Sequence, residues 1–137
     1  MGRMTKPFDD IFEEGALLQN VKYGMFTEKL VGGILLGFED GVHILISVNE
    51  DTDELVVERV SSSTALRDPV LDVSDRKPWS ENVGRPIFSA WELENHYGYH
   101  DSLQIEFGET VNDKHYTIQL QAIASSIHVK VVLDLAD

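Results

Sequence analysis

Hydrophobic and polar residues alternate along most of this chain with the two-residue period of β-strands. The pattern is clearest in 42–49, where Val42, Ile44, Ile46 and Val48 share one face. The segments between the alternating runs are mostly too short for a crossover helix, which favours antiparallel pairing. We therefore predict about eight antiparallel strands, over residues 16–26, 29–38, 42–49, 55–60, 86–95, 101–109, 114–124 and 126–135.

One short helix is predicted before the strands, within residues 5–14. Pro7 suits a first helical turn and Gly15 suits the end of the helix. Phe8, Ile11 and Phe12 fall on one helical face, which we expect to pack on a sheet. The fold class is mainly β, or α+β if the helix is counted. A curved sheet, a small barrel and a sandwich all fit the pattern.

A long irregular segment, residues 61–85, interrupts the alternation. It is rich in Ser, Asp and Pro, and no period persists through it. It nevertheless contains several apolar residues, among them Leu66 and Trp79, so we expect parts of it to dock on the body of the protein. Long connections within a domain tend to be functional or partly disordered.

The composition fits one soluble domain spanning residues 1–137. There is no cysteine, which excludes a disulfide scaffold, a thiolate nucleophile and cysteine-based metal sites. No apolar run has the length of a signal peptide or of a membrane span, so we expect a cytoplasmic protein that does not insert into membranes.

The formal net charge is −13, and the acids are unevenly distributed. Residues 39–58 contain seven acids and residues 86–113 contain six, and neither stretch has a Lys or Arg. Such a surface repels nucleic acid and anionic lipid and accelerates encounter with a basic partner. Acidity that only maintains solubility would give the same composition.

The run from Trp91 to Asp101 is the most informative stretch for function. Trp91 alternates with the strand core and is expected to be a buried anchor. The turn formers Gly98 and Asp101 indicate a hairpin corner, and the tyrosines beside the glycine would make a contact surface. The candidate binding residues are Trp91, Asn95, His96, Tyr97, Tyr99, His100 and Asp101.

The same loop offers a weaker metal-site hypothesis. His96 and His100 lie four residues apart with Asp101 adjacent, although Tyr97-Gly98-Tyr99 argues against a helix that would align them. Two surface histidines explain the pair more simply. We assign no catalytic residue, metal ligand or cofactor, because the chain has neither a nucleophile elbow nor a phosphate-binding glycine loop.

The segment 78–107 also carries a family resemblance. It contains Gly84-Arg85-Pro86 and then a W-x-L-x-N-x-x-G-Y-x-D run from Trp91 to Asp101. This resembles a family of small, functionally uncharacterised bacterial proteins known only as a domain of unknown function. The likeness extends from about residue 15 to the end of the chain. It implies a bacterial source and a single domain, and it carries no activity.

Three functional hypotheses follow. The first is a non-enzymatic binding or regulatory module for a basic protein, of the inhibitor, adaptor or immunity type, which the charge and the absence of catalytic signatures favour. The second is a metal-dependent or other small enzyme with a site near residues 95–101. The third is a self-associating structural protein, a homo-oligomer whose exposed strand edges pair between chains.

Overall fold

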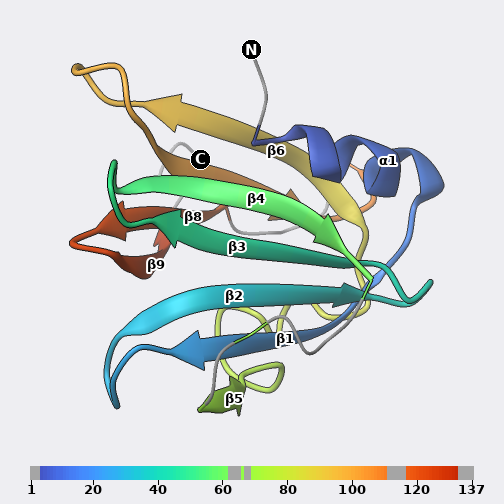
Figure 1. The fold of residues 1–137 in the computed structure, drawn as a ribbon. Coiled ribbons are helices and arrows are strands. Elements are labelled where there is room, and N and C mark those ends of the chain that lie inside the picture. The colour runs from blue at the N-terminus through green and yellow to red at the C-terminus, as the bar shows by residue number, and fades with distance from the viewer. Residues whose placement is uncertain (1–3, 62–65, 67–68, 111–116, 133–137) are drawn as a thin grey trace.

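The computed structural model describes residues 4–61, 66, 69–110 and 117–132. Within these residues, nine strands form two antiparallel sheets, of order β4-β3-β2-β1-β5 and β6-β7-β8-β9, and one short helix precedes them (Figure 1). In chain order the elements are α1 (Lys6–Glu14), β1 (Leu18–Met25), β2 (Val31–Phe38), β3 (His43–Asn49), β4 (Glu54–Val60), β5 (Val70–Asp72), β6 (Ile87–Glu94), β7 (His100–Phe107), β8 (Thr117–Ile123) and β9 (Ser126–Val132).

The two sheets bury their apolar faces against each other. In the five-stranded sheet Ile34 is the cross-strand partner of Ile46, and both are fully buried. In the four-stranded sheet Leu103 pairs with Leu120, and both are fully buried too. Strands β2 and β3 contact β9, while β4 contacts β7 and β8. The alternation predicted from the sequence therefore lines one core between two layers.

The structure decides between the three architectures that the sequence left open. The sheets do not close into a barrel, because β4 and β5 form the edges of one sheet and β6 and β9 form the edges of the other. A bridge between Leu17 and Pro86 links the segments that lead into β1 and β6. The mainly β, antiparallel fold class is confirmed, and its arrangement is a two-layer sandwich.

Helix α1 covers the open side of the sandwich between β4 and β6 (Figure 1). Gly15 ends the helix with φ +69°, and its N–H donates to the carbonyls of Ile11 and Phe12. Phe8 and Ile11 are buried as expected, but Phe12 is 54% exposed. The prediction for Phe12 was wrong. Within this short helix only Phe8 and Ile11 are buried, and the neighbouring Phe12 ring extends into solvent.

The segment 61–85 was predicted to be irregular, and its described part is more structured than that. It contributes β5, which pairs with β1, and it buries Trp79 completely in the core. The indole Nε1 of Trp79 donates to the hydroxyl of Tyr23 at 2.6 Å. Ser74 Oγ accepts the Val21 N–H at 2.9 Å, so a side chain continues the β1 ladder beyond β5.

The burial of Tyr23 makes the stability of the protein depend on pH in the alkaline range. Burial raises the pKa of Tyr23 above its ordinary value, so the folded protein retains the phenol proton at a pH where the unfolded chain loses it. The stabilisation is fully present below about pH 10 and is lost as the pH rises through the folded pKa. We expect Tyr23→Phe to lower stability at pH 7 by about 1–3 kcal/mol, because it leaves the buried indole N–H without an acceptor.

The measurement is urea unfolding of both proteins between pH 7 and pH 11. Wild type should lose more stability than Tyr23→Phe above pH 10, so the two curves converge. Parallel curves would show that Tyr23 does not titrate differently in the folded and unfolded chains.

Candidate binding surface

Four hairpin turns lie together at one end of the sandwich (Figure 1). They connect β1 to β2, β3 to β4, β6 to β7 and β8 to β9. We call this surface the hairpin end and define it by residues 26–30, 50–53, 95–99 and 124–125. It brings the aromatic loop predicted from the sequence into one surface with part of the acidic stretch 39–58.

Asn95 organises the β6–β7 turn. Its N–H donates to the Tyr99 carbonyl at 2.9 Å, and its side-chain Oδ1 accepts the N–H groups of Tyr97 and Tyr99 at 2.9 and 3.2 Å. Gly98 has φ +89°, a conformation that residues with a side chain rarely adopt. Asp101 receives a longer contact from Asn95 Nδ2, at 3.4 Å. Asn95 and Gly98 therefore form the turn that their residue types predicted, whereas Asp101 lies in β7 and contacts the Asn95 side chain rather than a backbone amide.

The aromatic side chains of this turn face solvent. Tyr97 is 76% exposed and Tyr99 is 47% exposed. The His96 ring lies against the Tyr97 ring, with centroids 4.0 Å apart. A turn held by hydrogen bonds presents its tyrosines in a defined position. Binding through such a turn loses little conformational entropy, because the backbone that carries the rings is already ordered before the partner binds.

Trp91 does not belong to this surface, and the prediction that it is a buried anchor was wrong. It is 45% exposed on the outer face of the four-stranded sheet. The register shifts between Ile87 and Ser89, where one strand holds an extra residue. Beyond this bulge Ala90 pairs with the buried Ile105, so the alternation is reversed and Trp91 points outward.

The two histidines of the loop do not share a site. His96 contacts Tyr97, whereas the His100 Nδ1 lies 2.6 Å from Glu92 Oε2 without the alignment of a hydrogen bond. Glu94 Oε1 is 4.0 Å from the other ring nitrogen of His100. In the described part of the chain, no group of three or more His, Asp or Glu side chains is arranged to hold a metal ion.

Contacts between distant segments fix the acidic β3–β4 turn beside the aromatic loop. The His100 N–H donates to Glu54 Oε2 at 2.9 Å. Asp53 accepts the N–H groups of Ala124 and Ser125 at 3.0 and 2.9 Å, which joins this turn to the β8–β9 turn. These contacts span 46 to 72 residues of sequence and were not anticipated from it.

With this geometry established, the chain can be compared with known proteins. A family model described as a family of unknown function (DUF6334) matches residues 4–135. The chain belongs to DUF6334. The comparisons with curated proteins and with solved structures give no match.

Residues that carried the sequence resemblance have structural roles in this DUF6334 chain. Trp79 is a core side chain, and Asn95 orders the β6–β7 turn. Gly84 and Gly98 both have φ +89°, which favours glycine. These four residues therefore contribute to turns and to packing.

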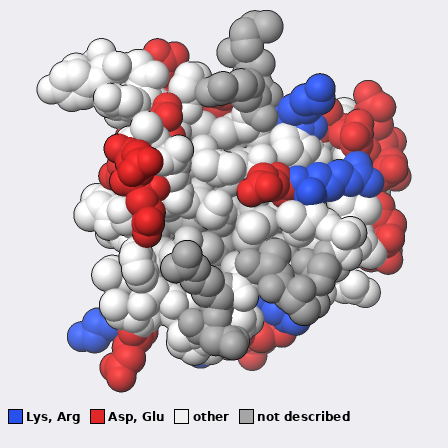
Figure 2. Space-filling model, viewed as in Figure 1, with Lys and Arg blue, Asp and Glu red and all other residues white. Residues whose placement is uncertain are grey.

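Acidic side chains form a cluster at the hairpin end of the DUF6334 sandwich, while the β1–β2 hairpin at the same end also carries Lys29 next to Glu28 (Figure 2). At the hairpin end, the acidic cluster beside the β3–β4 turn has no Lys or Arg next to it in this view. At the opposite end, acidic and basic side chains adjoin, and Asp10 of α1 pairs with Arg59 at 3.3 Å. The acidic β3–β4 turn therefore lies at the same end of the sandwich as the exposed tyrosines. No helix in the described part of the chain is long and apolar enough to cross a membrane.

Proposed function

We propose that this DUF6334 chain is a non-enzymatic binding module whose hairpin end takes a basic protein partner. The observation that carries the proposal is the placement of exposed Tyr97 and Tyr99 beside the acidic β3–β4 turn, through the contact between His100 and Glu54. The aromatic rings supply contact area, and the carboxylates favour a partner with a positively charged surface.

The physical chemistry of recognition supports this combination. Tyrosines in the centre of an interface often contribute much of the binding energy. Surface carboxylates accelerate encounter with a basic protein and select against acidic ones. The same charge disfavours nucleic acid and anionic membranes as partners. We propose the cytoplasm as the compartment, since a chain without cysteine needs no oxidising environment.

The test begins with capture of a partner on the immobilised protein from a lysate of its source, at low and at high salt. The captured protein is then purified, and its affinity is measured by calorimetry for wild type and for two matched double variants. Tyr97→Ser with Asp51→Asn alters the hairpin end. Phe12→Ser with Glu13→Gln removes one exposed aromatic and one charge from α1 at the other end of the sandwich.

We expect the hairpin variant to lose at least tenfold in affinity and the helix variant to lose less than twofold. Affinity should also fall as salt rises, because surface charges contribute to it. Equal losses in the two variants would show that only the net charge matters, and capture of no basic protein at low salt would reject the proposal.

A further inference from the structure

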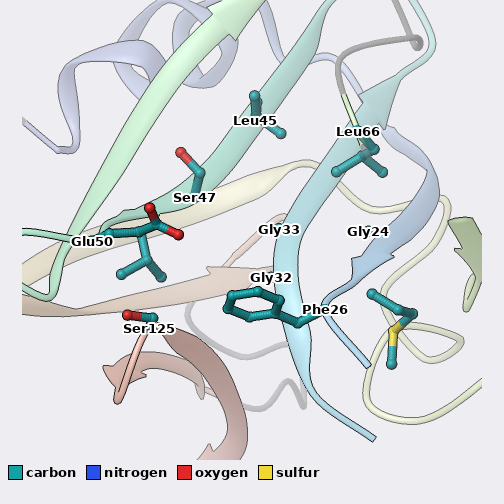
Figure 3. Close-up of a pocket in the computed structure, with 11 residues that line it drawn as sticks. Gly24, Phe26, Gly32, Gly33, Leu45, Ser47, Glu50, Leu66 and Ser125 are labelled. Atoms are coloured by element: carbon teal, nitrogen blue, oxygen red, sulfur yellow. The ribbon is translucent and has the colours of Figure 1, made fainter. Parts of the chain in front are cut away.

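A cavity of about 360 Å³ opens at the hairpin end, on the face of the five-stranded sheet that points away from the core (Figure 3). It lies between the β1–β2 hairpin, the start of the β3–β4 turn and Leu66, the one described residue in its part of the irregular segment. The β8–β9 turn adds Ser125 to its rim. Nothing in the sequence pattern predicted it.

Glycines form the floor of this cavity. Gly24 and Gly33 are cross-strand partners in β1 and β2, and Gly32 is the additional residue where the register shifts. A Cβ on Gly33 would lie 3.2 Å from Leu66 Cδ2, and a Cβ on Gly32 would lie 3.7 Å from Phe26 Cβ. Side chains at these positions would occupy the space that the glycines leave as flat backbone.

The lining has an apolar part and a polar part. In Figure 3 Leu66 lies at one side, Glu50, Ser47 and Ser125 lie at the other, and the half-exposed Phe26 ring is between them. The Glu50 carboxylate has no hydrogen-bond or ion-pair partner among the residues that the structure describes. A ligand in the cavity would therefore lie between an apolar side and an exposed carboxylate that has no partner among the described residues.

We infer that this cavity takes an arginine side chain of the basic partner, an inference that rests on the proposed function. The aliphatic stem would lie on the glycine floor beside Leu66, the guanidinium plane would stack on Phe26, and its N–H groups would reach Glu50. A carboxylate ligand would be repelled by Glu50. A purely apolar ligand would desolvate Glu50 without a compensating bond.

Arginine fits this lining better than lysine for reasons of shape and hydration. Its guanidinium is planar and presents five N–H donors, enough for Glu50 and for the hydroxyls of Ser47 and Ser125 together. It is also more weakly hydrated than an ammonium group, so it loses less on entering a partly apolar site. The lysine ammonium is a compact donor that would leave the flat floor and the Phe26 face unused.

The probe for the test is N-acetyl-arginine-N-methylamide, which mimics an arginine within a protein chain. The matched ligand is the citrulline derivative, which has nearly the same shape and no charge. Binding is followed by amide chemical shifts of the isotope-labelled full chain. We expect the arginine derivative to shift Gly24, Gly32 and Gly33 and the citrulline derivative to bind at least tenfold more weakly.

Two variants locate the charge. Glu50→Gln should weaken binding of the arginine derivative at least tenfold, whereas Glu13→Gln should change it less than twofold. Glu13 carries the same charge on the exposed side of α1, outside the hairpin end, and does not line the cavity. Unchanged binding by Glu50→Gln, or shifts confined to other surfaces, would overturn the inference. Tighter binding of free arginine than of the blocked derivative would identify a small metabolite instead of a protein side chain, and would also overturn it.

These outcomes separate the cavity from the proposed function. If the purified partner binds Glu50→Gln as tightly as wild type but loses affinity for the Tyr97 and Asp51 double variant, the hairpin end is an interface and the cavity takes no part in it. If the arginine derivative binds through Glu50 while no basic protein is captured, the cavity is a guanidinium site and the proposed function fails.

Discussion

Replacing Trp79 with alanine should lower the free energy of unfolding by about 3–5 kcal/mol, the cost of removing a large aromatic side chain from a core. Trp79 is fully buried, so its removal leaves a cavity that a packed interior fills only in part. It also deprives the Tyr23 hydroxyl of its 2.6 Å donor. Urea unfolding followed by far-ultraviolet circular dichroism measures the loss.

The second tryptophan supplies a matched control. Trp91→Ala removes the same side chain from the outer face of β6 and should change stability by no more than about 0.5 kcal/mol. If Trp79→Ala does not yield a folded protein, Trp79→Phe keeps one aromatic ring but lacks the Nε1–H, and it should give an intermediate loss. Equal effects at the two tryptophans would contradict the burial that distinguishes them.

The strands of this fold were predictable where each has one buried and one exposed face. In β7 the buried residues Leu103, Ile105 and Phe107 alternate with more exposed ones, and this period appears directly in the sequence. The eight predicted runs correspond to β1–β4 and β6–β9. For the runs 114–124 and 126–135, residues 114–116 and 133–135 lie outside the described part of the chain. The alternation of apolar and polar residues predicted these strands because each strand has its own buried face, whatever its neighbours in the sheet.

Features that depend on distant contacts could not be predicted in this way. Strand β5 is only three residues long and exists because β1 offers it an edge. Trp91 was assigned to the wrong face because one extra residue between Ile87 and Ser89 reverses the alternation, and no local pattern announces such a bulge. The choice of a sandwich over a barrel is likewise set by which strands pair.

The candidate surface shows the same division. The turn at Asn95 and Gly98 was predictable because its residue types have intrinsic conformational preferences. The approach of Glu54 to His100, and the glycine-floored cavity beside Glu50, arise from separate hairpins brought together by the two sheets. The distribution of acids along the sequence predicted a negatively charged surface. Only the fold showed that the exposed tyrosines lie next to the acidic β3–β4 turn.

Helix α1 carries the second large effect. Phe8→Ala should lower the free energy of unfolding by about 3–5 kcal/mol, because Phe8 is only 1% exposed and helps close the side of the core between β4 and β6. Phe12→Ala removes the same side chain one turn later from a position that is 54% exposed, and we expect a change of about 0.5 kcal/mol or less. Urea unfolding of both variants measures the difference.

The pair also decides how α1 contributes to the protein. If α1 is part of the cooperative core, circular dichroism and tryptophan fluorescence should report the same lowered unfolding midpoint for Phe8→Ala. If the helix is peripheral, Phe8→Ala should leave the midpoint of the sheets unchanged and remove only helical signal. Phe8 and Ile11 pack in one cluster with residues of both sheets, so we expect the cooperative result. Equal destabilisation by Phe8→Ala and Phe12→Ala would instead show that the helix turns both rings into the core in solution.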